Sequence, residues 1–278
     1  MGKENSILIL GSGTSTGIPI PRCSCSTCTS SNPKDHRFRT SLLLQTAQGS
    51  NILIDTTPDL RSQVLINQVE KIDGVVITHD HADHIHGIDD LRPFCFGPPL
   101  HPIPLWTSQH NAKTIISRFP YIFPQLLSEP PPQQLGGGIP LIELHQIELK
   151  PERPVKSTIL GEKFWHLPIP HGPYGESMAS IHGAFAYLTD ISHINPATVN
   201  YLKSLKLDLL IIDCVRDRPH PTHLDVPTAF KYIQKIAPRR AGLIHMNHDL
   251  DHDQLTKRAQ QVDGVEVFPT YDGQILKY

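Results

Sequence analysis

The chain has almost no excess of charge of either sign. Its 278 residues include 25 Lys and Arg against 27 Asp and Glu, which gives a formal net charge of −2. Proteins that bind extended nucleic acids neutralise many phosphates with basic side chains, and this sequence has no basic surplus for that purpose. An extended nucleic acid is therefore a weak candidate for a partner.

Long apolar segments are also absent from the sequence. No run approaches the ~20 apolar residues that cross a bilayer, and residues 1–6 lack the hydrophobic region of a signal peptide. We therefore expect a cytoplasmic protein without a membrane partner. The same six residues match a myristoylation pattern, but the strand expected to begin at Ser6 would leave almost no tether, and we interpret the match as chance.

The length suffices for one sizeable core, and we expect a single α/β domain over residues 1–278. Strand-like and helix-like segments alternate in both halves of the sequence. Residues 119–140 interrupt this alternation, because they contain three consecutive prolines at 130–132 and three glycines at 136–138. We expect a projecting Pro/Gly-rich insertion there, either a mobile surface loop or a lid over the substrate.

The sequence is organised around residues 78–84, Thr-His-Asp-His-Ala-Asp-His, which follow a short apolar run at 74–77. That run is β-branched and follows an Asp-Gly turn signal, so we expect a buried strand. Imidazoles and carboxylates that converge at a strand end suit divalent metals. The alternative is a polar loop in a chain that has 17 histidines. We favour a metal site, with candidate ligands His79, His81, Asp83 and His84.

Three later residues of ligand type each lie at the end of an apolar run. His171 follows the segment 164–167, Asp190 ends the alternating segment 184–190, and His245 ends the segment 241–245. Catalytic metals are held by three or more protein ligands and keep an open position for water. These three residues are therefore candidates to complete the site.

Cysteines are few, and three of the five lie close together as Cys23, Cys25 and Cys28. In a chain with no export signal the thiols stay reduced, which favours metal binding over disulfides. Three thiolates leave a tetrahedral zinc one ligand short. The alternative is a redox-active or unliganded cluster.

The order H-x-H-x-D-H, then His171, Asp190 and His245, resembles the metallo-β-lactamase superfamily of hydrolases from Ile7 to the C-terminus. Three further features resemble its phosphoribosyl 1,2-cyclic phosphate phosphodiesterase branch. They are the Gly-Ser-Gly-Thr segment at 11–14, the cysteine cluster, and the Pro-Thr-His-Leu-Asp segment at 221–225. The resemblance implies an αβ/βα sandwich of two mixed sheets with helices on the outer faces.

The same resemblance implies three metals, of which two are catalytic Mn²⁺ or Zn²⁺ and one is a structural Zn²⁺. The catalytic pair would be held by His79, His81 and His171 on one side, by Asp83, His84 and His245 on the other, and by Asp190 as a bridge. The structural zinc would be held by Cys23, Cys25, Cys28 and His248. His223 would be a catalytic residue that protonates the leaving oxygen, and Asp83 would also orient the attacking water.

Several elements around these residues can be predicted. We expect a hairpin from 41–46 and 51–55, helices over 58–68, 84–94 and 226–236, and a strand over 207–213. Asp55 ends a strand and is either an acceptor for a metal-bound imidazole or a turn acid before the next helix. His86 should face away from the ligands on its helix. The glycine-rich residues 11–17 depart from the dinucleotide fingerprint, and we expect a flexible loop near the active site.

Three functions compete at this stage. The favoured one is a dinuclear hydrolase that acts on a small, possibly cyclic, phosphodiester. The second is a tRNA 3′-processing nuclease or another hydrolase of the superfamily, and the third is a non-catalytic binding or cofactor-biosynthesis protein. The expected partner is thus a small phosphodiester substrate, and the sequence leaves a homodimer open.

Overall fold

The computed structural model describes residues 4–97, 99–128, 138–173 and 175–278, and it contains two sheets of seven strands each. The first sheet has the order β14 (Ile275–Lys277), β1 (Ser6–Gly11), β2 (Ser41–Gln45), β3 (Asn51–Ile54), β4 (Gly74–Val76), β5 (Ile103–Ser108) and β6 (Ile142–Ile147). The second has the order β13 (Glu266–Pro269), β12 (Arg240–Ile244), β11 (Leu209–Asp213), β10 (Phe185–Leu188), β9 (Gly175–His182), β8 (Glu162–His171) and β7 (Val155–Ile159).

Both sheets are mixed. In the first sheet β14, β1, β2 and β3 pair antiparallel, and β3 to β6 pair parallel. In the second, β7 to β10 pair antiparallel and β10 to β13 pair parallel. Parallel neighbours direct their carboxyl ends to the same edge, so each sheet presents a row of strand ends on which a site can be built.

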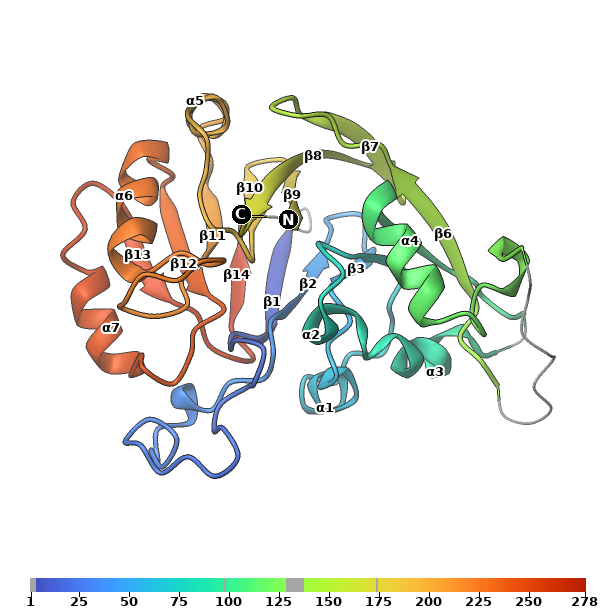
Figure 1. The fold of residues 1–278 in the computed structure, drawn as a ribbon, viewed down its shortest axis with the longest axis horizontal. Helices are drawn as coiled ribbons and strands as arrows, with labels where there is room; N and C mark the ends of the chain where they lie inside the picture. Colours follow the sequence, from blue (N-terminus) through green and yellow to red (C-terminus); the bar gives the residue numbers. More distant parts are fainter. Residues whose placement is uncertain (1–3, 98, 129–137, 174) are drawn as a thin grey trace.

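Helices cover the outer face of each sheet (Figure 1). The first sheet carries α1 (Leu60–Ile66), α2 (Ala82–Ile85), α3 (Arg92–Cys95) and α4 (Gln109–Arg118). The second carries α5 (Pro196–Ser204), α6 (Val226–Ile236) and α7 (His252–Ala259). Short 3₁₀ turns lie at Pro33–Asp35 (η1), Ile88–Leu91 (η2) and Pro124–Leu126 (η3). The arrangement confirms the predicted αβ/βα sandwich. None of the helices in the described part of the chain is long and apolar enough to cross a bilayer.

Alternation along the strands produces three apolar layers. In β1, Ile7 and Ile9 belong to the cluster between the two sheets, whereas Leu8 and Leu10 belong to the cluster under the first set of helices. A third cluster fills the space between the second sheet and its helices. Side chains of a strand point alternately to opposite faces, so a strand that is apolar at every position is buried on both.

The two elements next to the site that were predicted most closely are the hairpin and α6. β2 and β3 pair antiparallel as expected, with Leu43 opposite Leu53. α6 spans the predicted residues, and the carboxylate of Asp225 accepts a hydrogen bond from the Thr228 backbone N–H at its start. An acid at this position satisfies one of the free N–H groups of the first turn, and the proline in that turn needs no such partner.

The predicted helix over 84–94 is wrong as a single element. The chain forms α2, a turn at His86–Gly87, η2 and α3 in succession. A Cβ on Gly87 would lie 1.9 Å from the carbonyl oxygen of Thr57, so the backbone packs there more closely than any other residue allows. That contact breaks the helix immediately after the ligand-rich loop.

Two further expectations need correction. Phe119, Ile122 and Phe123 are buried in the core under the first sheet, so the beginning of the 119–140 insertion does not project, while its centre at 129–137 lies outside the described residues. Residues 11–14 are not a free loop, because the Gly13 N–H donates to Phe38 and the Thr14 N–H donates to Met246.

Candidate metal centre

The ligand-type residues predicted from the sequence converge where strand ends of both sheets meet. His79 to His84 follow β4, His171 ends β8, Asp190 lies two residues after β10, and His245 directly follows β12. Two groups of ligand atoms result, and within each group all ligand atoms lie within 4.8 Å of one another. The members of the first group are His79, His81, His171 and Asp190, and those of the second are Asp83, His84, Asp190 and His245.

Asp190 is the residue common to both groups. Its Oδ2 lies 3.4 Å from His79 Nε2 and 3.3 Å from His84 Nε2, and its Oδ1 lies 3.1 Å from His245 Nδ1. Burial alone would raise the pKa of this carboxyl, but the surrounding histidines, His245 and His84 foremost, hold it well below its usual value. A carboxylate placed in this way can contribute one oxygen to each of two neighbouring cations.

Three residues at the strand ends adopt backbone conformations that are rare for side-chain-bearing residues. Asp55, Asp190 and His245 have φ values of 67°, 51° and 63°. Left-handed φ costs free energy for any residue except glycine, and such residues gather at functional sites. At each of these strand ends the backbone turn directs a polar side chain toward the site.

Hydrogen bonds orient several of the imidazoles. His84 Nδ1–H donates to Asp55 Oδ2 over 2.8 Å, and His171 Nδ1–H donates to the Thr222 carbonyl oxygen over 2.8 Å. Thr40 Oγ1 lies 3.0 Å from His245 Nδ1. A proton fixed on one ring nitrogen leaves the electron pair of the other nitrogen free, and here a proton on Nδ1 leaves Nε2 free to bind a metal. Asp55 therefore acts as an acceptor for an imidazole, and the N-cap of α1 is Asp59.

The unsatisfied atoms of the site fit bound cations. Among the buried polar atoms of the described residues, His79 Nε2, His84 Nε2 and Asp83 Oδ2 have no hydrogen-bond partner, and all three face the space around Asp190. Buried polar atoms without partners are uncommon unless they bind something. Burial lowers the pKa values of His171 and His245 to about 3, which keeps these imidazoles neutral and able to coordinate.

A histidine–aspartate pair lies beside the two groups. His223 Nδ1–H donates to Asp213 Oδ2 over 2.9 Å, and the His223 ring lies 4.7 Å from the ring of His245 and 5.0 Å from that of His171, between ring centres. Burial alone would lower the pKa of His223, but the charges of Asp213 and Asp190 raise it to about 9. The second nitrogen of His223 is thus available as a proton donor next to the candidate metals.

The cysteine cluster lies on a separate segment at the lower left of Figure 1, in the dark blue chain after β1. The Sγ atoms of Cys23, Cys25 and Cys28 lie 3.3, 3.5 and 3.6 Å from His248 Nδ1. A backbone N–H from Cys28 contributes most to lowering the pKa of Cys25 to about 7, which favours its thiolate. Three sulfur atoms and one imidazole nitrogen at mutual contact fit a four-coordinate zinc.

Sequence reasoning missed three supporting residues. Asp213 was placed at the end of a predicted strand without a role, and nothing in the sequence singled out Thr40 or the Thr222 carbonyl. The signal for Asp213 was its position, since Asp55 ends the corresponding strand of the first half. The ring centre of His220 lies 5.0 Å from that of His223.

Comparisons with known proteins place this geometry in a family. The family model for the β-lactamase superfamily domain matches residues 50–246. A solved structure described as a new diphosphatase from the PhnP family is 33% identical, with a TM-score of 0.85 over 99% of this chain and 97% of its own. The Zn²⁺-bound PqqB from Methylobacterium extorquens is 15% identical, with a TM-score of 0.75 over 98% of this chain and 100% of its own, and supports the fold alone.

A longer relative is named octanoyltransferase, from Porphyromonas gingivalis. It is 36% identical over 267 residues, which are 96% of this chain and 50% of that protein. The chain thus spans about half the length of this curated relative. The model match covers most of the chain, and the diphosphatase is similar along its whole length, so the chain belongs to the metallo-β-lactamase superfamily of hydrolases and lies close to its PhnP family.

Proposed function

We propose that the chain is a dinuclear metal-dependent phosphodiesterase for small substrates. The observation that carries this proposal is the pair of four-residue ligand groups that share Asp190, with the His223–Asp213 pair beside them. The first metal would be held by His79, His81, His171 and Asp190, and the second by Asp83, His84, His245 and Asp190. When bound, two divalent ions would lower the pKa of a coordinated water and neutralise charge on a phosphoryl oxygen.

The residues of the chain supply the remaining parts of the reaction. Within the described residues Asp83 Oδ2 has no hydrogen-bond partner, and Asp83 would orient the attacking water as well as hold the metal. His223 would donate the proton of its free nitrogen to the leaving oxygen, and Asp213 would hold the ring in place and stabilise its charge. An alkoxide leaves poorly without a proton, so this donor matters most for alkyl esters.

The net charge of the chain favours a small substrate over an extended one. The net charge of −2 provides no basic surplus for an extended nucleic acid, which disfavours the tRNA-processing alternative. The similar PhnP-family structure is described as a diphosphatase, which also supports a small phosphate compound as the substrate. Phosphoanhydrides should therefore be assayed as well.

Turnover of four model compounds tests the proposal. Protein loaded with manganese or with zinc should hydrolyse bis(4-nitrophenyl) phosphate and a strained cyclic phosphodiester faster than 4-nitrophenyl phosphate or a chromogenic β-lactam. Faster turnover of the β-lactam, or no turnover of any diester with either metal, would contradict it.

A variant isolates the proton donor. His223→Ala should retain both metals and lose about 10²–10⁴-fold in rate for an alkyl ester, because general acid catalysis contributes on that order. The loss should be smaller for a 4-nitrophenyl ester, whose phenolate leaves without a proton. An equal loss for both leaving groups would remove His223 from this role. His193→Ala, an exposed histidine on the loop after β10, is the matched control.

A second candidate is hydrolysis of an octanoyl thioester, which the similarity to half of the octanoyltransferase-named protein favours. The candidate metal centre could polarise a carbonyl as well as a phosphoryl oxygen. An octanoyl thioester assayed beside the diesters decides between them, since preferential turnover of the thioester would support the second candidate.

A further inference from the structure

The first sheet ends at β6, which pairs with β5 on one side and with no strand of the described residues on the other (Figure 1). The Ile103 N–H of β5 donates to the Leu141 carbonyl oxygen, so alternate residues from Leu141 onward direct their backbone groups to β5. The residues between them, Ile142, Leu144 and Gln146, direct their N–H and C=O groups away from the sheet. This edge therefore has free backbone donors and acceptors.

The other three sheet edges carry features that prevent strand pairing. β14 has only three residues, β13 ends in Pro269, and β7 exposes Lys156. Short length, proline and exposed lysine are common means by which an edge strand avoids pairing with another chain. β6 has six residues and contains neither proline nor lysine. Among the strands that the structure describes, β6 is thus the edge that can best accept a further strand.

An apolar groove of about 540 Å³ runs along the same edge. Residues 139–144 form one part of its lining, and Leu126 belongs to the other. Leu126 and Ile139 expose 49% and 40% of their surface, and the half-exposed Phe96 ring packs against the backbone of Gly138 beside the groove. Large apolar side chains exposed close together mark contact surfaces on soluble proteins.

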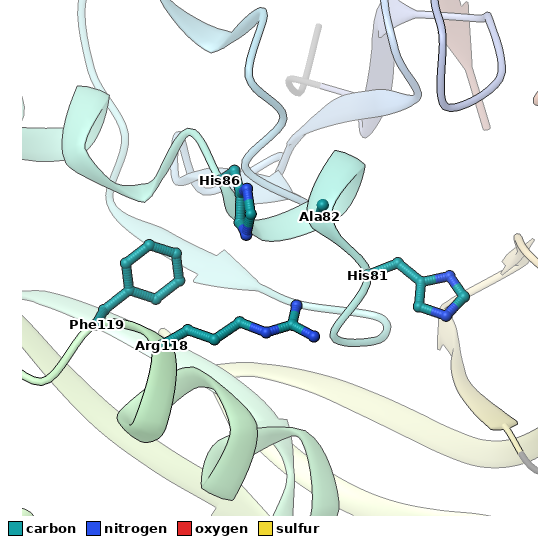
Figure 2. A pocket seen from close by; sticks show the side chains of 5 residues that line it. All are labelled: His81, Ala82, His86, Arg118 and Phe119. Atoms are coloured by element: carbon teal, nitrogen blue, oxygen red, sulfur yellow. The ribbon is translucent and has the colours of Figure 1, made fainter.

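The groove is separate from the candidate metal centre. The cavity beside that centre is lined by His81, Ala82, His86, Arg118 and Phe119 (Figure 2). It shares no lining residue with the groove. Phe119 lines the cavity and Ile122 lines the groove, and the Ile122 N–H donates to the Phe119 carbonyl oxygen, with both side chains buried in the core. The groove therefore needs an occupant other than the substrate of the proposed reaction.

The sequence of β6 is complementary to itself. If two copies pair antiparallel about a two-fold axis at Leu144, Glu143 of each copy lies opposite His145 of the other. An acid opposite an imidazole is a favourable cross-strand pair, and the symmetry supplies it twice. The same register makes the two Leu144 residues a hydrogen-bonded pair, which agrees with the outward direction of their backbone groups.

Charge disfavours the neighbouring registers. An axis at Glu143 would place two carboxylates opposite each other, and an axis at His145 would do the same with two imidazoles. His145 is also held in position, because its ring stacks on Trp106 at 5.0 Å between centres and its Nε2 lies 3.3 Å from Glu143 Oε1. Side chains that are ordered before association lose less entropy on binding.

We propose that the β6 edge is an interface between two copies of this chain. Antiparallel β6 strands would join the first sheets of both copies, and the pairing would cover the exposed Leu126 and Ile139 of each. Each candidate metal centre lies entirely within its own chain, so association should leave its chemistry unchanged. The inference therefore does not depend on which reaction the centre performs.

Sedimentation equilibrium of the full chain tests the association. At micromolar to submillimolar concentrations the wild-type protein should form a dimer, and a chain that stays monomeric throughout this range would overturn the proposal. His145→Glu places an acid opposite Glu143 twice in the symmetric interface and should raise the dissociation constant at least about tenfold. An unchanged constant would mean that the copies meet at another face, which would also overturn it.

The matched control adds the same charge at a different edge. Thr158 is exposed on β7, and Thr158→Glu should leave the dissociation constant within about twofold of the wild-type value. Dissociation by Thr158→Glu together with an intact dimer in His145→Glu would place the interface on β7 and overturn the assignment to β6. Circular dichroism and metal content of each variant confirm that the fold is retained.

Exchanging the two charges tests the register. Glu143→Lys alone should weaken the dimer, because it places a lysine opposite His145. Glu143→Lys combined with His145→Glu restores opposite charges across the axis, and the double variant should recover the wild-type dissociation constant to within about threefold. A double variant as weak as its two parents added together would overturn the pairing about Leu144.

Amide hydrogen exchange of the wild-type protein locates the contact. The N–H groups of Ile142 and Leu144 gain partners only in the dimer, so they should exchange at least about tenfold more slowly at a concentration that favours the dimer than after dilution. The Glu143 N–H faces β5 in both states and is the internal control. Equal exchange of Leu144 before and after dissociation would show that the dimer forms elsewhere, and would overturn the proposal.

Discussion

The two clusters of metal-ligating residues differ in how the fold supports them. The catalytic candidate is almost entirely buried, draws its residues from strand ends of both sheets, and is oriented by Asp55, Thr222 and Thr40. The cysteine cluster is partly exposed and joins two loops outside the sheets. A rigid sheet edge suits chemistry that needs fixed geometry, whereas a cross-link between loops suits stability.

A short segment connects the two clusters. His245 and His248 are three residues apart, and Met246 between them exchanges backbone hydrogen bonds with Ser12 and Thr14. The cysteine cluster is therefore attached to the loop that carries a catalytic candidate.

Asp190→Ala should have the largest effect. One side chain lies within 3.4 Å of nitrogen atoms on His79, His84 and His245, so its loss removes a ligand from both groups at once. We expect metal content in the catalytic groups and turnover to fall together, with a rate loss of at least ~10³-fold. Elemental analysis of wild-type protein should give three metals per chain and of the variant one. A variant that keeps three metals would disprove the bridging role.

Asp55→Asn should have an intermediate effect. Asp55 is fully buried, and it accepts hydrogen bonds from His84 Nδ1 and from the Thr78 backbone N–H. Loss of such an acceptor weakens metal affinity or activity about 10- to 100-fold. Competition with a chelator measures the affinity, and Asp253→Asn, an exposed acid on α7, is the control. An unchanged chelator midpoint would show that Asp55 serves the backbone turn alone.

The comparison also shows what sequence could predict. The seven catalytic ligand candidates and the three cysteines could be named because each lies next to an apolar run or in a dense motif, whereas His248 was implied by the family resemblance. Asp213 and Thr40 could not be assigned, since their roles depend on which loops meet after the sheets pack. The left-handed backbone at Asp55, Asp190 and His245 also has no signal in the sequence, because tertiary contacts impose it.

The errors have physical causes as well. The apolar spacing of residues 84–94 is helical, but the close backbone approach of Gly87 to Thr57 divides the segment. Gly11 and Gly13 suggested flexibility, whereas a Cβ on Gly11 would lie 1.9 Å from the Arg39 carbonyl oxygen. A glycine that allows tight packing cannot be distinguished by sequence from one that allows motion.

Cys25→Ser should affect stability more than catalysis. Structural zinc binding is coupled to folding, so we expect the melting temperature to fall by about 5–15 °C, while the activity per folded molecule stays within about threefold. His248→Ala should behave like Cys25→Ser, and His245→Ala should instead lose catalytic metal. Differential scanning calorimetry and zinc analysis check this ordering. A stable Cys25→Ser protein with its full zinc content would contradict the structural role.

His166 provides the smallest test, because it is a buried histidine that does not face either cluster. Its nitrogens lie 2.8 and 3.1 Å from the hydroxyls of Ser157 and Ser180, and burial lowers its pKa to about 4. The unfolded chain binds a proton near pH 6.5 and the folded chain does not, so the free energy of unfolding falls as pH falls from 6.5 to 4.

Between pH 7 and pH 5 this contribution should be about 1–2 kcal/mol. Urea unfolding of metal-free wild-type and His166→Gln protein at both pH values measures this contribution. The change in stability of the variant between the two pH values is subtracted from that of the wild-type protein, so the effect of the lost hydrogen bonds cancels. The variant should lose less stability than the wild-type protein over this interval. An identical loss of stability in both proteins would mean that His166 binds a proton in the folded protein as readily as in the unfolded chain. The hydroxyls of Ser157 and Ser180 would then not determine the protonation of His166, unlike the carboxylates beside the histidines of the metal centre.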